Sequence, residues 1–208
     1  MAAPMRDDMS IDVVGMMEWV NDDNSLPDTV LRSNFHASRL QQLYTRNSAA
    51  YKGVMALILK AGAKDFLKGT DMSHATYTLE YTDIHHIFPQ HYCEKKGIDR
   101  TRWNSVINKT PIYARTNRII GGYAPSQYLS SLERNHAADP IQLNASLTSH
   151  QIDVDAIRAD DFDTYFIKRQ QSLLDLIERA TGKEVSGREE PQTTMSQYDI
   201  AEMETNED

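Results

Sequence analysis

The stretch from Tyr81 to Gln90 reads YTDIHHIFPQ and joins two adjacent histidines to a carboxylate. Apolar residues recur from Tyr77 to Phe88 with threonines between them, and this β-branched and aromatic composition predicts a partly buried strand. Pro89 cannot donate a hydrogen bond to a neighbouring strand, so we expect the strand to end before it. The two histidines therefore belong to a rigid element of the fold.

The overall composition sets the class of protein. At 208 residues the chain is long enough for one well-packed domain with tails. It contains no apolar run of the roughly 18 residues that a membrane span requires, and acidic residues interrupt the stretch from Met1 to Val20, unlike a signal peptide. We therefore expect a soluble, cytoplasmic protein with no membrane partner. Cys93 is the single cysteine, which excludes an internal disulfide and every multi-cysteine zinc site.

The charge of the chain is unevenly distributed. The net charge is −8, yet the segment 81–135 carries eight Lys or Arg residues against four acidic ones. A basic centre within an acidic frame is compatible with phosphate binding at one site, although ordinary charge scatter would give the same count. General adhesion to DNA is disfavoured.

Apolar periodicity divides the chain into three parts. Residues 1–25 form a segment that we expect to be partly ordered. Residues 26–182 predict one α+β, mainly helical domain, with helical patterns between 27 and 62 and a long helix from Asp160 to Thr181 that Gly182 ends. Residues 183–208 are acidic and poor in large apolar side chains, so we expect a disordered tail.

A compact unit is predicted in the middle of this domain. We expect the first strand to be followed by a polar loop over 91–104, a second strand over 106–113 and a short helix. Thr116 is a plausible N-cap for that helix, and Gly121 and Gly122 would end it. The order is therefore strand, loop, strand, short helix.

The two histidines suggest a division of labour. Adjacent residues of a strand point to opposite faces, so His85 and His86 are expected to do different jobs. One imidazole would bind a metal ion and the other would take a proton from water, which are the two functions that phosphodiester hydrolysis needs. A His-His pair taken alone more often consists of two polar strand residues or of two ligands of a structural ion.

Two asparagines extend the pattern. Asn108 stands 22 residues after His86, and Asn117 stands nine after Asn108. With these residues the sequence resembles the HNH, or ββα-metal, endonucleases, and in particular the C-terminal HNH domain of GmrSD-type modification-dependent restriction enzymes. The resemblance spans about 26–182 and rests on the segments Asp83–Pro89, Ile107–Asn108, Thr116–Arg118, Pro125–Leu129 and Asp161–Leu174. It implies a ββα core at about 77–122, a two-stranded hairpin plus a short helix, packed between N-terminal and C-terminal helices.

The resemblance implies a role for each matching residue. His86 would be the general base that activates water, and Asn108 would support catalysis by bracing the loop that aims it. His85 and Asn117 would bind the metal ion, with water and phosphate oxygens completing its shell. Asp83 would orient His85 or touch the ion from outside, although a plain strand-end carboxylate is an equal alternative.

Three cations and the metal complete the expected site. Arg115, Arg118 and Lys109 are candidates for phosphate binding, because guanidinium forks suit phosphate oxygens, and a solvated surface role is the alternative. One imidazole, one amide oxygen and several waters suit a hard octahedral ion. We therefore expect Mg²⁺, with Mn²⁺ as the second choice and Ni²⁺ or Zn²⁺ as substitutes.

The resemblance thus predicts a metal-dependent endonuclease that hydrolyses double-stranded DNA, in restriction or anti-phage defence. Two alternatives stay open: a catalytically weak HNH-fold module that binds DNA or a partner protein, and an RNA-directed nuclease. Residues 1–80 contain no Gly-rich phosphate loop and nothing like the nucleotide-handling N-terminal domain of GmrSD-type enzymes. Two expectations stay open: a C-terminal fragment whose regulatory N-terminal domain or partner subunit is absent from this chain, or a free-standing nuclease whose control comes from elsewhere.

Overall fold

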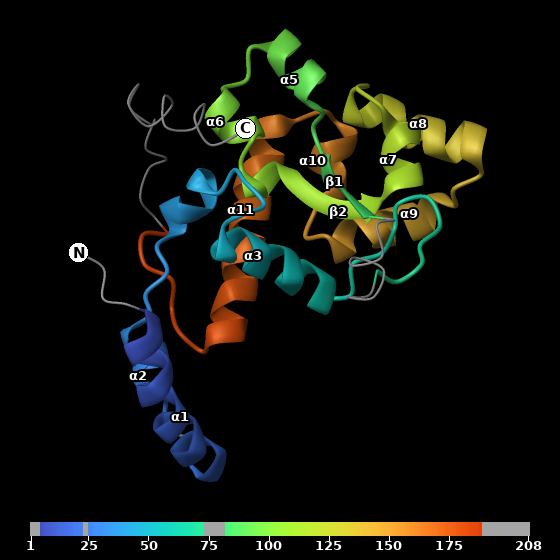
Figure 1. Cartoon of the computed structure of the whole chain (residues 1–208). Coiled ribbons are helices and arrows are strands. Elements are labelled where there is room, and N and C mark those ends of the chain that lie inside the picture. The colour runs from blue at the N-terminus through green and yellow to red at the C-terminus, as the bar shows by residue number, and fades with distance from the viewer. Residues whose placement is uncertain (1–4, 23–24, 73–81, 189–208) are drawn as a thin grey trace.

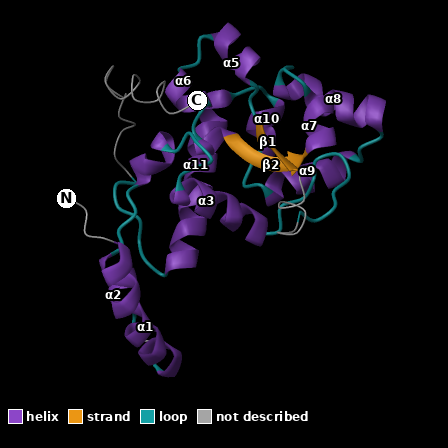
Figure 2. Cartoon of the chain, viewed as in Figure 1, coloured by secondary structure: helices purple, strands orange, loops and turns teal. Residues whose placement is uncertain are grey.

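The fold is known from a computed structural model, which describes residues 5–22, 25–72 and 82–188 (Figure 1). Helices make up most of the described chain, and a two-stranded antiparallel sheet lies among them (Figure 2). The α+β, mainly helical class that the sequence predicts is confirmed. None of the described helices is long and apolar enough to span a membrane.

The N-terminal part contributes four helical elements. They are α1 (Met5–Asn21), α2 (Asp28–Arg32), the 3₁₀ helix η1 (Ala37–Gln42) and α3 (Ala49–Lys60). In Figure 1, α1 and α2 project from the rest of the molecule, whereas α3 lies close to the sheet. Ser48 caps α3, because its hydroxyl oxygen accepts a hydrogen bond of 3.2 Å from the backbone N–H of Tyr51. The helical spacing of the apolar residues places one face of α3 in the core: Tyr51, Val54, Met55 and Ile58.

The sheet is the hairpin of β1 (Thr82–His86) and β2 (Lys109–Tyr113), with Thr82 opposite Tyr113 and His86 opposite Lys109. The second strand is shorter than the sequence predicts, and the first ends at His86, before Pro89, as expected. Residues 77–81 lie outside the described part, and 106–108 form the 3₁₀ turn η2 (Val106–Asn108) instead of strand. The chain leaves β1 after His86, where the backbone N–H of Phe88 bonds the Asn108 side chain.

The connection between the strands is more helical than the sequence predicts, since a loop with at most one helical turn is expected over 91–104. It contains α5 (Gln90–Lys96) and α6 (Arg100–Trp103). Gly97 ends α5 in the left-handed conformation, with φ of 69°. Asp99 begins α6, because its carboxylate accepts a 2.7 Å hydrogen bond from the Thr101 N–H. Two local capping signals therefore outweighed the polar composition of the segment.

The short helix α7 (Ala114–Ile120) follows β2 directly. It begins before Thr116, which was wrongly predicted as its N-cap. The Thr116 hydroxyl instead donates a 2.8 Å hydrogen bond to the buried carboxylate of Asp65. A hairpin followed at once by a short helix matches the order that the sequence predicts for the central unit.

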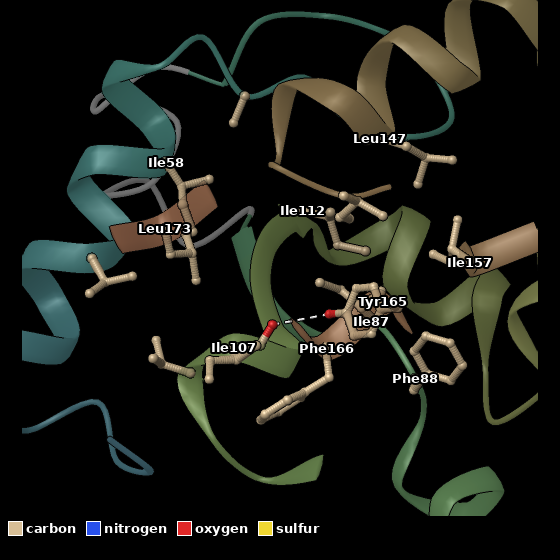
Figure 3. Packing of buried hydrophobic residues seen from close by; sticks show 14 of the residues in the cluster. Ile58, Ile87, Phe88, Ile107, Ile112, Leu147, Ile157, Tyr165, Phe166 and Leu173 are labelled. Atoms are coloured by element: carbon tan, nitrogen blue, oxygen red, sulfur yellow. Dashed lines mark hydrogen bonds between the residues drawn. The ribbon is translucent and has the colours of Figure 1, made fainter. Parts of the chain in front are cut away.

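Four C-terminal helices complete the fold: α8 (Pro125–His136), α9 (Pro140–Ser149), α10 (Val154–Arg158) and α11 (Phe162–Thr181). The predicted long helix is confirmed as α11, which Asp161 caps and Gly182 ends. Figure 3 shows Phe166 and Leu173 of α11 in the same buried cluster as Ile107 and Ile112. The Tyr165 hydroxyl donates a 3.0 Å hydrogen bond to the Ile107 carbonyl, the dashed line in Figure 3.

The folded part extends beyond the predicted boundary at residue 182. Val185 is buried, and Ser186 forms two backbone hydrogen bonds, of 3.1 Å with Phe35 and 2.9 Å with Ala37. The expectation of a disordered tail from residue 183 was therefore wrong for 183–188, because this segment pairs with the chain before η1. Residues 189–208 lie outside the described part.

Candidate active site

The two histidines of β1 point to opposite faces of the hairpin. His85 pairs with Thr110 and His86 with Lys109 in an uninterrupted antiparallel register. Without a bulge, successive side chains alternate between the faces. Asp83 therefore shares a face with His85, and His86 lies on the other face.

On the first face, His85 meets Asn117 of α7. His85 Nδ1 lies 2.9 Å from Asn117 Oδ1, and Asn117 Nδ2 donates a 3.3 Å hydrogen bond to the Asp83 carboxylate. Because the amide nitrogen faces Asp83, its oxygen must accept from His85, so the proton of the neutral imidazole sits on Nδ1. The structure thus brings together three residues that the sequence singled out.

The second nitrogen of His85 is a buried acceptor. Its Nε2 has no hydrogen-bond partner among the described residues, and the whole residue is 3% exposed. Burial lowers the pKa of His85 to about 3; the hydrogen bond with Asn117 opposes this effect, and the charges of His86, His150 and Arg169 add to it. At neutral pH the imidazole is uncharged, which is the form that binds a metal ion.

An ion held by both residues would replace the proton on His85 Nδ1, which would move to Nε2. The 2.9 Å between His85 Nδ1 and Asn117 Oδ1 is then close to the separation of about 3 Å between neighbouring ligands of Mg²⁺, whose bonds are about 2.1 Å long. Asp83 adds a carboxylate next to the pair. Among the described residues no group of three or more His, Cys, Asp or Glu side chains gathers around a common point. Most ligands of such an ion would therefore be waters and substrate oxygens.

Asn108 is fully buried and braces the chain that leaves β1. Its amide donates hydrogen bonds of 2.9 Å to the Phe88 carbonyl and 2.8 Å to the Trp103 carbonyl. Its oxygen accepts a 2.9 Å bond from the Phe88 N–H. Asn108 thus ties the residues after His86 to the end of α6, the bracing position that the resemblance implies.

His86 has different surroundings. It is partly exposed, its Nε2 lies 3.3 Å from Oδ1 of Asn104, and its ring meets Trp103 edge-on at 5.7 Å between centroids. Asn104 was not singled out from the sequence. The only feature of the sequence that could have drawn attention to Asn104 is its place directly after Trp103, the one tryptophan between the two strands. Asn104 and Trp103 together orient the imidazole.

The three expected phosphate-binding cations separate into two groups. Arg115 and Arg118 are exposed on α7, and neither forms an ion pair within the described residues. Lys109 is only 7% exposed, and its ammonium donates a 2.8 Å hydrogen bond to the carbonyl of Tyr44. This position contradicts the expectation for Lys109, because the side chain is used to attach the N-terminal layer to β2.

Comparisons with known proteins identify one related sequence. An uncharacterized protein of Methanocaldococcus jannaschii is 34% identical over 128 residues, which cover 60% of this chain and 21% of that protein. The chain thus spans about a fifth of the length of this relative. No model of a known protein family matches the chain, and no solved structure matches it.

Proposed function

We propose that the chain is a metal-dependent DNA endonuclease of the HNH type, which hydrolyses phosphodiester bonds in double-stranded DNA in restriction or anti-phage defence. One observation carries the proposal: His85 and Asn117, which are 32 residues apart, meet at 2.9 Å where the hairpin joins α7. These are the two positions that the resemblance assigns to the metal. The Asn108 brace supports the proposal independently.

The residues fit Mg²⁺ or Mn²⁺, which His85 and Asn117 would hold. When bound, the ion supplies positive charge to the scissile phosphate and its leaving oxygen. Asp83 fixes the Asn117 amide so that its oxygen faces His85. Asn108 holds the backbone directly after His86, and His86 acts as the general base that takes a proton from water.

The opposite orientation of the histidines restricts where the phosphate can lie. His85 and His86 can approach one phosphate only at the edge of β1 that faces away from β2. No strand pairs with this edge in the described part of the chain. We therefore place the scissile phosphate at the outer edge of β1, with the water on the His86 side.

A plasmid-nicking assay tests the assignment of the base. The purified chain should convert supercoiled plasmid to nicked or linear forms with Mg²⁺ or Mn²⁺ and lose this activity in EDTA. His86→Ala should slow cleavage by at least about 10²-fold, the typical contribution of a positioned general base. His136→Ala is the matched control, because His136 is an exposed histidine at the end of α8. Equal cleavage by the wild type and His86→Ala would refute the role of His86.

One observation favours a second function, an HNH-fold module that binds DNA or a partner protein without cutting it. His85 is 3% exposed and lies on the opposite face of the sheet from His86. A large substrate therefore has little access to the His85 side chain and cannot reach both histidines from one face. Such a module would bind Mn²⁺ and DNA without nicking any plasmid. Binding and nicking measured on the same preparation separate the two functions.

A further inference from the structure

A cavity of about 340 Å³ opens beside the start of α7. It is lined by two residues of the segment after α3, by the end of β2 and by α7: Leu67, Lys68, Tyr113, Ala114, Arg115, Thr116 and Arg118. Small-ligand sites have volumes of roughly 300–1,000 Å³. This cavity therefore suits a single small unit rather than a segment of chain.

The buried carboxylate of Asp65 joins the two walls of this cavity. Its oxygens accept hydrogen bonds from the backbone N–H groups of Leu67 (3.1 Å), Lys68 (3.2 Å) and Tyr113 (3.0 Å). They also accept a 2.8 Å bond from the hydroxyl of Thr116. All four donors belong to residues that line the cavity, and Asp65 itself is 0% exposed. The shape of the cavity is thus fixed before any ligand arrives.

The lining combines an apolar floor with a cationic rim. Leu67, Ala114 and Tyr113 are its apolar and aromatic residues, called the floor below. Lys68, Arg115 and Arg118 are exposed, and none of them forms an ion pair within the described residues. Arg115 and Arg118 are three residues apart in α7, so their side chains lie on one face of the helix. Two guanidinium groups and an ammonium group on one rim suit a phosphate.

We propose that this cavity holds one nucleotide that is unpaired and flipped out of the nucleic-acid strand. The base would lie against Tyr113 and Leu67, and the phosphate would be bound by Arg115, Arg118 and Lys68. An aromatic ring accepts any base, and a cationic rim follows the backbone, which is how single strands are held without base readout. The cavity is an additional binding site, separate from His85 and Asn117.

The position of the cavity relates it to the candidate active site. Asn117 lies between Thr116 and Arg118 in α7, and each residue turns the helix by about 100°. Arg118 therefore lies about 100° and Arg115 about 160° around the helix from Asn117, so the metal pair and the cationic rim occupy different faces of the same short helix. A nucleotide held in the cavity would contact α7, the helix that also carries Asn117. The identity of the ligand as a nucleic acid rests on the proposed nuclease function.

Fluorescence anisotropy with a labelled single-stranded DNA oligonucleotide in EDTA tests the proposal without requiring cleavage. Arg115→Ala/Arg118→Ala should weaken binding by about tenfold or more, and the slope of log affinity against log salt should fall by roughly 1.4, for two lost phosphate contacts. Arg134→Ala/Arg179→Ala is the matched control, because it removes two exposed arginines from α8 and α11. Circular dichroism confirms that each variant is folded.

Tyr113 tests the floor of the cavity. Tyr113→Leu should weaken oligonucleotide binding by about tenfold, since it removes the ring on which a base stacks, and Tyr113→Phe should bind like the wild type. An equal loss in the two arginine double variants would overturn the proposal. So would unchanged binding by Tyr113→Leu, which would leave only an anion site.

A deoxynucleoside monophosphate that binds as tightly as the oligonucleotide would also overturn the proposal, because the cavity would then serve a free nucleotide. Plasmid nicking distinguishes this failure from the failure of the proposed function. If the protein binds the oligonucleotide through the cavity but never nicks DNA, the proposed nuclease function is refuted, whereas the proposal that the cavity binds a nucleotide still holds.

Discussion

Two histidines, His85 and His150, are both buried, and both meet the ring of Phe66 edge-on, at 6.2 Å and 5.0 Å between centroids. Burial lowers the pKa of each to about 3. They differ in their hydrogen bonds. His150 uses both ring nitrogens, with Nδ1 2.6 Å from the Thr110 hydroxyl and Nε2 2.8 Å from the Lys64 carbonyl. His85 uses one, and its Nε2 has no partner within the described residues.

The difference separates a structural histidine from a candidate ligand. A buried polar atom is normally paired, because an unpaired one costs the free energy of its desolvation. His150 meets this rule and joins three segments, those of Lys64, Thr110 and α9. His85 breaks the rule and bonds only to an amide that is itself held by Asp83. The two histidines therefore have the same lowered pKa but different roles. The number of hydrogen bonds that each ring forms is what distinguishes them.

The largest expected effect is acid unfolding, to which both histidines contribute. An unfolded chain protonates each imidazole with a pKa near 6.5, whereas the folded chain keeps both neutral down to about pH 3. The free energy of unfolding should therefore be fully present above pH 6.5 and fall as the pH drops. Each histidine removes about 1.4 kcal/mol per pH unit, so the pair removes about 5 kcal/mol between pH 6 and pH 4.

Urea denaturation in EDTA at several pH values measures this loss. Other carboxylates titrate in the same range, so the informative quantity is the difference between the wild type and each of His85→Gln and His150→Gln. Either variant should lower the slope of stability against pH by about 1.4 kcal/mol per unit. A slope that neither substitution changes would mean that the imidazoles are not held neutral.

The second largest expected effect is a difference in stability between variants of the two buried histidines, His85 and His150. His150→Phe should lower the free energy of unfolding at pH 7 by about 3 kcal/mol, because the Thr110 hydroxyl and the Lys64 carbonyl lose their partner. His85→Phe should cost about 1 kcal/mol or less, because it also removes a buried nitrogen that has no partner. Urea denaturation in EDTA compares the two. Equal losses of unfolding free energy in the two variants would show that the unpaired Nε2 of His85 does not destabilise the folded protein.

The smallest effect concerns Asp83, which holds the Asn117 amide beside His85. Asp83→Asn should weaken Mn²⁺ binding by about tenfold, roughly 1.4 kcal/mol, as is usual when a group that orients a metal ligand is removed. Isothermal titration calorimetry measures the affinity, and His150→Gln serves as the control that should bind like the wild type. Wild-type affinity in Asp83→Asn would leave Asp83 as a plain strand-end carboxylate.

Elements with local signals were predictable. The strand around His85, the helix α11 with Asp161 and Gly182 at its ends, and the Ser48 cap of α3 all follow from periodicity and capping. The helical content of the connection between the strands was underpredicted, as a loop with at most one helical turn, because its polar composition hid two short helices.

Asp65 marks the limit of prediction for the candidate sites. A local turn in which Asp65 accepts from the N–H groups of Leu67 and Lys68 can be anticipated from the sequence. Its bonds to Tyr113 and Thr116, about 50 residues further along the chain, cannot, because nothing local specifies them. The cavity that these bonds fix was therefore invisible to pattern analysis.

The sequence by itself determined the mainly helical class and the order of the central elements, since strand alternation, caps and glycine breaks act within a few residues. It also singled out His85, His86, Asn108 and Asn117 as candidate site residues. Only the tertiary structure decided which of these side chains meet. It paired His85 with Asn117, turned His86 toward Asn104 and buried Lys109 beneath the N-terminal layer. The physical reason is that each contact joins segments whose approach depends on the packing of the whole core, which no local pattern encodes.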